Sequence, residues 1–469
     1  MAMQYIFEAF GFLADPFTLF ILFLSVLVGL IFGLLPGLTA TMAVALLTGL
    51  TYSFDGMLAI VSLLGVYIGS ISGGCQAAIL LNIPGTPASA ATALEGYPLG
   101  RQGKGGLAIF VANGSSFLGT VIGIICVLLF TPLITSIALK FGAQEMFLLA
   151  VFGVVICGGV SAGGFALKGW IAGFLGLFVS QIGLDKIDSV ARFTFGDINL
   201  SAGISLLPVM IGLFGIPEVI DAFNYEKRNV IPVSKFKIKE GFQVLLQNKL
   251  NIVRSGIMGV VMGAIPGVGE DTGGWLAYWA EKKMSKKGGW GEGQINGVVA
   301  SEAGNNAAVG GAIIPVLSLA VPGSAPAAVL LAAFWMHGYR PGPLLMTDTP
   351  EFLYYVVITM TVAAIFMWIQ ASTISRITVK LLQIDARFLM PIIFICCVVG
   401  AYVVNNRIFD VYMMLVFGVV GIIMKKLNYP AAPFLLGVIL GDMLDQNLRR
   451  ALILTNGEIS SFFTRPISL

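Results

Sequence analysis

The chain has 469 residues, of which 57% are hydrophobic and 11% are charged, so it carries too little polar surface to cover a water-soluble globule. Because a helical span needs about 20 apolar residues, the composition predicts an integral membrane protein of about ten full spans and excludes a large extramembrane enzyme domain. The 27 basic and 24 acidic residues give a net charge of +3, which does not indicate a nucleic-acid-binding protein.

Apolar runs that could form spans or half-spans follow one another along the whole chain. In order they cover residues 17–35, 57–81, 107–133, 145–162, 169–183, 204–220, 255–265, 295–321, 352–371, 388–404, 411–424 and 430–444. Only the stretch 221–254 is long and hydrophilic, and its charged residues are mostly basic. These basic residues are Lys227, Arg228, Lys235, Lys237, Lys239, Lys249 and Arg254. The positive-inside rule therefore predicts that this stretch is a cytoplasmic linker.

The linker separates two halves that resemble each other. Residues 34–37 match 264–267 at a Pro-Gly pair, and residues 83–86 match 321–324 at a second pair. Each half is interpreted as a hairpin interrupted at the first pair, a span broken at the second pair, and four further spans. Five full crossings per half would invert the second half relative to the first. The predicted fold is thus all-α, with about ten full spans plus two re-entrant hairpins in two inverted repeats.

The predicted organisation follows from this duplication. Residues 1–220 form the first repeat, 221–254 the basic cytoplasmic linker, 255–450 the second repeat and 451–469 a C-terminal tail. Most loop charges agree with the inverted topology. Four basic residues do not, because the scheme places them outside: Lys140, Arg407, Arg449 and Arg450.

Four Pro-Gly breaks lie at matched positions: Pro36-Gly37, Pro84-Gly85, Pro266-Gly267 and Pro322-Gly323. Each break leaves backbone amide and carbonyl groups that hydrocarbon cannot satisfy, so it persists only beside a polar cavity or inside protein. Paired interrupted segments in two related halves are typical of a transporter's central site. We therefore predict that the breaks converge near mid-bilayer. The alternative for any single break is a helix kink that serves packing.

Polar side chains around the breaks are hydroxyls and amides, which can hydrogen-bond a carboxylate without a full positive charge. They are Asn82, Thr86, Ser89, Thr92, Ser301, Asn305, Asn306, Ser318 and Ser324. No intramembrane Arg or Lys is repeated between the halves, so a multiply charged anion would need a co-bound cation. This pattern predicts symport with Na⁺ or H⁺. The alternative for each side chain is hydrogen bonding between packed helices.

Glu270 and Asp271 directly follow the third break, and a carboxylate at membrane depth indicates function. They are candidates for cation coupling together with the backbone of Pro36, Gly37, Pro266 and Gly267. The alternative places both acids at the mouth of the hairpin or at the cap of a helix beginning near Thr272. Glu95 and His337 are expected at equivalent ends of the two broken spans. We expect no cofactor and no metal site beyond a possible Na⁺.

Two long motifs suggest a family. Residues 78–105, AILLNIPGTPASAATALEGYPLGRQGKG, and 301–345, SEAGNNAAVGGAIIPVLSLAVPGSAPAAVLLAAFWMHGYRPGPLL, resemble the signatures of the large membrane subunit of tripartite tricarboxylate transporters, the TctA family. The resemblance implies a cation-driven importer of di- or tricarboxylates in the bacterial inner membrane. It also implies two partners: a small TctB-like membrane subunit of about four spans and a periplasmic TctC-like solute-binding protein.

The same resemblance maps a substrate-binding region onto this chain. Its residues would be Asn82, Pro84, Gly85, Thr86, Pro87, Ser89, Ser301, Asn305, Asn306, Pro322, Gly323 and Ser324. An elevator movement of the hairpin-bearing part is expected by analogy with other binding-protein-dependent transporters. Segment 267–271 carries acids where many relatives look neutral, so the coupling ion or substrate is open. An intramembrane enzyme and a passive organic-anion channel are the alternatives, and a single histidine without metal-spaced ligands argues against the enzyme.

Overall fold

The protein is almost entirely helical in the computed structural model, which describes residues 2–161, 165–222, 230–285, 288–383, 386–403 and 405–465. The one sheet in these ranges is an antiparallel pair, β1 (Gly183–Leu184) and β2 (Ala191–Arg192). The predicted all-α membrane fold is confirmed. Lys227 and Arg228 of the predicted linker lie outside the described residues.

Helices of the first half run from the N-terminus to the linker. They are α1 (Ala2–Leu13), α2 (Pro16–Leu34), α3 (Ala40–Leu50), α4 (Gly56–Leu81), η1 (Pro87–Ser89), α5 (Ala90–Leu99), η2 (Gly100–Lys104), α6 (Gly105–Ala138), α7 (Ala143–Ser161), α8 (Ala166–Ser180), α9 (Ile198–Ser201), α10 (Leu206–Met210), η3 (Ile211–Gly215) and α11 (Ile216–Ala222). The predicted run 204–220 is one continuous helical stretch from Leu206 to Ala222, in which η3 is a π-helical turn between α10 and α11.

Helices of the second half begin inside the predicted linker. They are α12 (Ile238–Gln247), α13 (Lys249–Ala264), α14 (Gly269–Met284), α15 (Ile295–Leu319), α16 (Ala325–Met336), α17 (Leu345–Asp348), α18 (Phe352–Leu381), α19 (Ala386–Val403), α20 (Ile408–Lys426), α21 (Ala431–Leu454) and α22 (Ser461–Thr464). The linker contains α12 because an apolar stripe ending in Leu245 packs against α6, while Lys239 and Glu240 stay exposed.

Among the described residues, 5 helical segments are long and apolar enough to cross a membrane. They are Pro16–Leu34, Gly56–Leu81, Pro87–Ala138, Phe352–Ser375 and Ile408–Lys426. Shorter apolar helices are Ala40–Leu50, Ala143–Gly159, Ala166–Ser180, Ala325–Met336 and Leu389–Val403. The chain is therefore a multi-pass membrane protein. The number of full spans, the domain boundaries and the inversion of the second repeat stay predictions.

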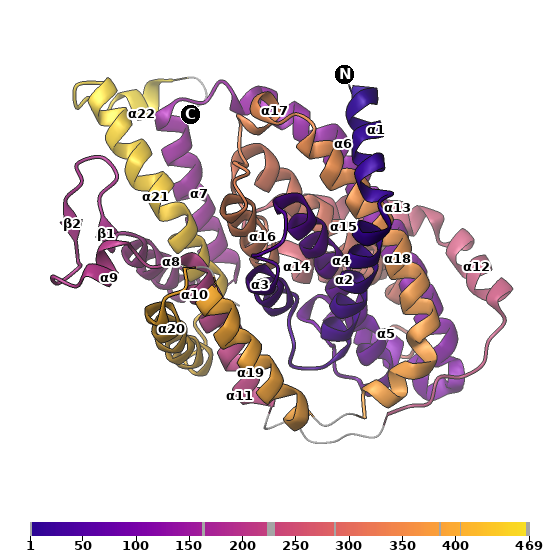
Figure 1. Cartoon of the computed structure of the whole chain (residues 1–469). Helices are drawn as coiled ribbons and strands as arrows, with labels where there is room; N and C mark the ends of the chain where they lie inside the picture. The colour runs from indigo at the N-terminus through magenta and orange to yellow at the C-terminus, as the bar shows by residue number, and fades with distance from the viewer. Residues whose placement is uncertain are drawn as a thin grey trace.

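The helices gather in two groups that Figure 1 shows side by side. We call α2, α4, α6, α13, α14, α15 and α18 the central bundle, and α7, α8, α20 and α21 the lateral bundle. The two predicted halves are interleaved in both groups, because α15 packs along α6 and α21 packs along α7 and α8. Helix α16 bridges the groups, since it contacts α4 and α21, and α3 packs against α4, α16 and α19.

Matched glycines build the same backbone contact in each half. A Cβ on Gly85 would lie 1.9 Å from the carbonyl oxygen of Gly33, and a Cβ on Gly323 would lie 1.9 Å from that of Gly263. The helices before these breaks also end alike, since Asn82 has φ 57° and Ala320 has φ 56°. Each broken segment therefore packs directly against the backbone of its hairpin, and glycine is required at the contact because a Cβ would not fit.

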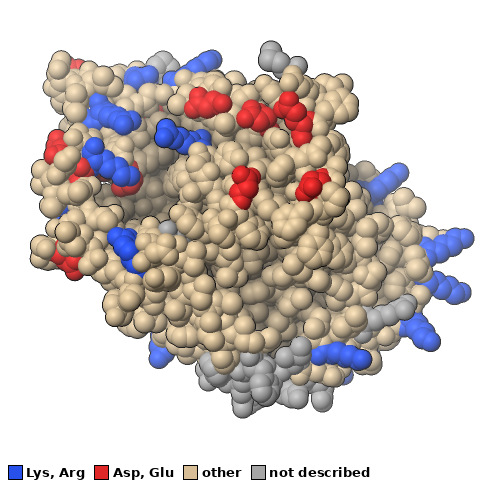
Figure 2. Space-filling model, viewed as in Figure 1, with Lys and Arg blue, Asp and Glu red and all other residues tan. Residues whose placement is uncertain are grey.

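Charged side chains lie at the edges of the molecule. In Figure 2, basic side chains project at the right edge, where α12 lies in Figure 1, and acidic side chains occupy the upper edge near α17. The exposed basic residues around α12 include Lys235, Lys237 and Lys239, and Asp348 of α17 is exposed. Basic side chains also lie at the upper left of Figure 2, so the cytoplasmic position of the linker stays a prediction.

Candidate substrate and ion site

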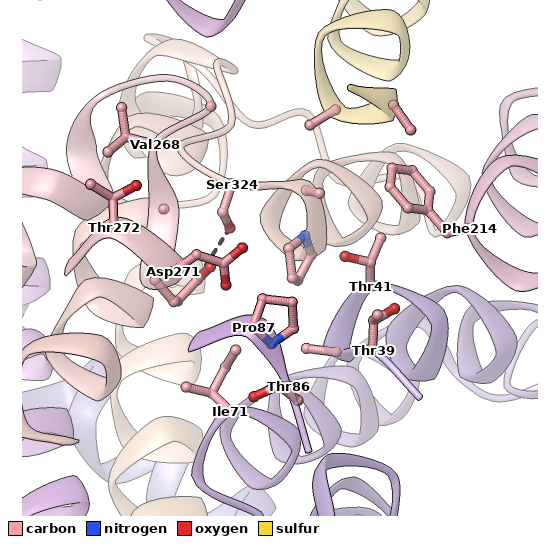
Figure 3. A pocket seen from close by; sticks show the side chains of 18 of the residues that line it. Thr39, Thr41, Ile71, Thr86, Pro87, Phe214, Val268, Asp271, Thr272 and Ser324 are labelled. Atoms are coloured by element: carbon pink, nitrogen blue, oxygen red, sulfur yellow. Dashed lines mark hydrogen bonds between the residues drawn. The ribbon is translucent and has the colours of Figure 1, made fainter. Parts of the chain in front are cut away.

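A cavity of about 440 Å³ lies where the segments that follow the four Pro-Gly breaks meet. Its wall is formed by residues 39–41, 86–87, 267–272 and 324–326, with Ile71, Phe214 and residues 430–432 (Figure 3). The first four segments come from the two hairpins and the two broken spans, while Phe214 belongs to η3 and residues 430–432 begin α21. The segments after all four breaks therefore share one cavity, although Gly267 is the one break residue among those that line it.

Besides α21, three helices begin at the wall of this cavity. Thr39 is the N-cap of α3 and accepts a hydrogen bond from Met42 N at 3.2 Å, and Ser324 is the N-cap of α16 and accepts one from Ala327 N at 3.3 Å. Helix α14 begins at Gly269. Helix N-termini carry partial positive charge, so the backbone makes this cavity favourable for an anion.

Glu270 and Asp271, which are adjacent in α14, have different structural roles. The Asp271 side chain is exposed to the cavity, where it lies between Ser324 and Pro87 (Figure 3). Glu270 is 3% exposed and accepts hydrogen bonds from the Tyr67 hydroxyl and from Ser324 Oγ, the latter at 3.0 Å. Glu270 thus joins α14 to α4 and α16, whereas Asp271 is available to a ligand. Neither acid caps α14 with its side chain, since the N-cap is Val268 and makes no such bond.

The wall has no cationic side chain. None of the cavity-lining residues in the described part of the chain is Lys, Arg or His. An anion in this cavity would therefore meet helix N-termini, the hydroxyls of Thr39, Thr41 and Ser324, and the negative charge of Asp271.

The predicted substrate residues separate into three groups. Thr86, Pro87 and Ser324 line the cavity. The backbone residues Asn82, Pro84, Gly85, Pro322 and Gly323 form the breaks themselves and do not line it; Asn82 is exposed as the left-handed C-cap of α4. The remaining four, Ser89, Ser301, Asn305 and Asn306, are fully buried outside the cavity wall. Among the cation candidates, Gly267, Glu270 and Asp271 line the cavity, while Pro36, Gly37 and Pro266 do not.

The third group surrounds Glu302, a fully buried carboxylate on α15 that sequence reasoning passed over. Its oxygens accept hydrogen bonds from the Thr92 hydroxyl, from Ser116 Oγ at 2.9 Å and from Asn306 Nδ2 at 3.4 Å. The Thr92 hydroxyl also lies 2.8 Å from Ser301 Oγ. The signal was available, because an acid inside the predicted span 295–321 is as unusual as Glu270 and Asp271.

Glu95 is a second buried acid with a different surrounding. Its carboxylate accepts hydrogen bonds from Tyr278 Oη at 2.8 Å and from the backbone amides of Gly291, Gly293 and Gln294 at 2.7, 3.0 and 2.8 Å. It therefore fixes the loop between α14 and α15 to α5. The expected equivalence with His337 is wrong, because Glu95 lies inside α5 whereas His337 is the C-cap of α16.

The fold defines a multi-pass α-helical membrane protein, and the family match assigns it to the transporters. Residues 19–436 match the family described as tripartite tricarboxylate transporter TctA family. The chain belongs to this family, and the resemblance found in the sequence motifs is confirmed.

Two relatives from Agrobacterium vitis support this assignment. The chain is 33% identical over 451 residues to an uncharacterized 52.8 kDa protein in the TAR-I ttuC′ 3′ region. The aligned residues cover 95% of this chain and 89% of the relative. It is 35% identical over 211 residues to an uncharacterized protein in the TAR-II ttuC′ 3′ region, covering 45% of this chain and 87% of the relative. No solved structure matches the chain significantly.

Proposed function

We propose that this chain is the substrate-translocating permease subunit of a binding-protein-dependent, cation-coupled importer of di- or tricarboxylates. The observation that carries the proposal is the cavity in which the segments after all four Pro-Gly breaks meet. Its volume of about 440 Å³ is in the range of small-molecule sites. The N-termini of α3, α14 and α16 supply partial positive charge, and hydroxyls supply hydrogen bonds to carboxylate oxygens.

Cation coupling is supported by the charges at the cavity. Two like charges about 4 Å apart repel by about 4 kcal/mol at the effective dielectric of a protein surface, and by more in a drier site. A dicarboxylate beside Asp271 therefore needs compensating charge, and the wall provides no cationic side chain in the part of the chain that is described. A co-transported Na⁺ or H⁺ is the simplest source of this charge.

An elevator-type movement is supported by the position of the cavity. One wall comes from the hairpins and broken spans, including Asp271 and Thr86, and the other from Phe214 and residues 430–432, which start α21 of the lateral bundle. Displacement of the first wall relative to the second would open the cavity to alternate sides of the membrane.

The partners follow from the family. We propose that the chain works in the bacterial inner membrane with a small TctB-like membrane subunit and a periplasmic TctC-like protein that delivers the carboxylate. Substrate choice would then be divided between the capture protein and the cavity. No cofactor is needed beyond the coupling ion.

The test is uptake into proteoliposomes that contain the chain and its two partners. Radiolabelled organic acids that bind the capture protein would be offered under an imposed Na⁺ gradient, an imposed H⁺ gradient or neither. We expect saturable accumulation that requires one gradient and the capture protein. Gradient-independent, non-saturable flux would instead identify a passive channel, and chemical conversion of the recovered acid would identify an intramembrane enzyme.

A further inference from the structure

Beside the cavity lies a second polar cluster in which buried oxygen atoms from both halves surround one carboxylate. Glu302 on α15 is at its centre, with Thr92 from α5 and Ser116 from α6 as hydrogen-bonding neighbours. All three side chains are at most 1% exposed. No ion pair involves Glu302 within the described ranges, so an ionised Glu302 carboxylate would have no protein counter-charge there.

We propose that the Glu302 cluster binds a monovalent metal cation of the sodium type, and that this ion is the one co-transported with the substrate. The inference rests on the proposed transport function and deepens it, because it separates the ion site from the substrate cavity. A buried carboxylate without a counter-charge is unfavourable in the membrane interior, and a bound cation removes that cost.

The neighbouring atoms are of the kind that a hard metal cation prefers. Both oxygens of Glu302 and the hydroxyl oxygens of Thr92, Ser301 and Ser116 gather at one place, and a hydroxyl that donates to a carboxylate still has lone pairs for a cation. A proton would need only a single acceptor oxygen. The collected hydroxyls therefore favour a metal ion over a proton.

Two further hydroxyls are buried without any hydrogen bond. They are Thr86 Oγ1 and Ser89 Oγ, and both residues are at most 1% exposed. Ser89 lies close to the Glu302 carboxylate without meeting hydrogen-bond geometry. Orphaned buried hydroxyls are rare in proteins, since each costs the loss of its bonds to water. A cation at the cluster would supply the partner that Ser89 lacks.

These two hydroxyls also connect the cluster with the cavity. A Cβ on Gly74 would lie 2.6 Å from Thr86 Oγ1 and 2.8 Å from Ser89 Oγ, so the missing side chain at Gly74 leaves them room. Thr86 belongs to the cavity wall and Ser89 lies close to Glu302. The segment after the second break thus contacts substrate at one residue and the ion site three residues later.

This arrangement explains how the ion would favour substrate binding. The ion site is complete only when η1 and α5 of the first half lie against α15 of the second half. A bound cation therefore stabilises the same placement of Thr86 and Pro87 that forms the cavity wall. Ion and substrate would then each raise the affinity for the other, as thermodynamic linkage requires.

The experiment measures Na⁺ binding to the full chain in detergent or nanodiscs, without substrate and without partners. Thermal unfolding is followed while Na⁺ replaces K⁺ at constant ionic strength, because a ligand that binds only the folded state raises the melting temperature. We expect Na⁺-specific stabilisation of the wild type. Glu302→Gln should lower the apparent Na⁺ affinity at least tenfold, and Thr92→Val and Ser116→Ala should each lower it about threefold to tenfold.

Matched controls have the same chemistry away from the cluster. Glu240→Gln lies on the exposed part of α12, and Thr373→Val removes a hydroxyl that bonds its own helix at Ile369 O and Gln370 O. Both should bind Na⁺ as the wild type does. Asp271→Asn should also keep Na⁺ binding, which distinguishes the Glu302 cluster from the cavity acid.

Two results would overturn the inference. The first is a wild type whose stability does not distinguish Na⁺ from K⁺. The second is unchanged Na⁺ affinity in Glu302→Gln or, if that variant does not fold, in both Thr92→Val and Ser116→Ala. In the uptake assay, proton-driven transport that needs no Na⁺ would likewise overturn the co-transport role of the Glu302 cluster but keep the proposed function. Na⁺ binding at Glu302 without carboxylate uptake would keep the ion site and contradict the proposed function.

Discussion

The Tyr67 hydroxyl on α4 hydrogen-bonds the Glu270 carboxylate on α14, across 203 positions of the chain. Both residues are buried, and Ser324 Oγ lies 3.0 Å from the Tyr67 hydroxyl and 3.0 Å from Glu270 Oε1. Three helices from the two halves are thereby connected at the cavity wall, which Glu270 and Ser324 both line. Because Glu270 is buried in this way, Asp271 is the one of the two acids whose side chain is exposed in the cavity.

The link between Tyr67 and Glu270 can be measured by a double-mutant cycle. Tyr67→Phe and Glu270→Gln should each destabilise the protein by about 1–3 kcal/mol, because each removes a partner from a buried polar group. The double variant should lose less than the sum of the two, since the second change removes an interaction that is already broken. Unfolding in detergent gives the values, and Tyr412→Phe, which is 60% exposed, is the control. Strict additivity would show that the contact contributes nothing.

Asp271→Asn should alter the cation dependence of uptake. Removing a negative charge from the cavity wall should let an anionic substrate bind several-fold more tightly when the cation is limiting, since Coulomb repulsion falls. The apparent KM for the carboxylate is measured at low and high cation concentration. The exposed Asp348→Asn on α17 is the control. An unchanged KM at limiting cation would assign Asp271 to a structural role.

Thr86→Val should reduce uptake at least tenfold while leaving expression intact. The substitution keeps the shape of the side chain and removes a buried hydroxyl beside the cavity wall that has no hydrogen-bond partner among the described residues. Initial uptake rates are compared with those of Thr361→Val, whose hydroxyl bonds the Val357 carbonyl of its own helix. Normal transport by Thr86→Val would mean that the first long break has a structural role only.

Gly85→Ala and Gly323→Ala should each destabilise the protein by about 1–3 kcal/mol or more, because a Cβ would enter the space of a backbone carbonyl 1.9 Å away. The two effects should be similar, since the same contact occurs in each half. Melting temperatures in detergent test this. Gly11→Ala is the control, because nothing lies within 4 Å of its Cβ and Ala favours the exposed helix by roughly 0.5–1 kcal/mol. Tolerance of both substitutions would contradict the close helix approach.

The stability of the folded protein should depend on pH through Asp185, which directly follows β1. Hydrogen bonds from the backbone amides of Asp188 and Ile187, with Arg449 and Arg192 beside the carboxylate, lower the pKa of Asp185 from 3.8 to about 2. Because the folded-state pKa lies below the unfolded one, the stabilisation is fully present above about pH 4 and is lost as pH falls toward 2.

Thermal unfolding of the wild type and Asp185→Asn between pH 2 and 6 checks this prediction. The difference in melting temperature should be constant above about pH 4 and should shrink below it. A difference that stays constant down to pH 2 would show that the Asp185 carboxylate is not stabilised in the folded state.

Some residues of the site could be predicted from the sequence and others could not. The difference is whether a residue acts on its own segment or is placed by the packing of distant helices. Pro84-Gly85 and Pro322-Gly323 were found because proline and glycine act on the backbone of their own segment, wherever the rest of the chain lies. Thr86 and Ser324 follow these breaks directly and were found with them. Ser301 and Asn305 were predicted to meet the substrate, but they lie in the Glu302 cluster, because α15 turns that face toward α5 and α6.

Composition and the repeated Pro-Gly pairs alone determine that this chain is an all-α membrane protein with four interrupted helices, and two long motifs identify its family. These are local properties, since hydropathy and backbone restriction act within a few neighbouring residues. Which acid faces a ligand and which is enclosed was decided only by the tertiary structure. Asp271 and Glu270 are neighbours in sequence, and their difference comes from Tyr67, more than 200 positions away. Glu302 acquires its hydroxyl neighbours for the same reason, because only the packing of α15 against α5 and α6 brings them together.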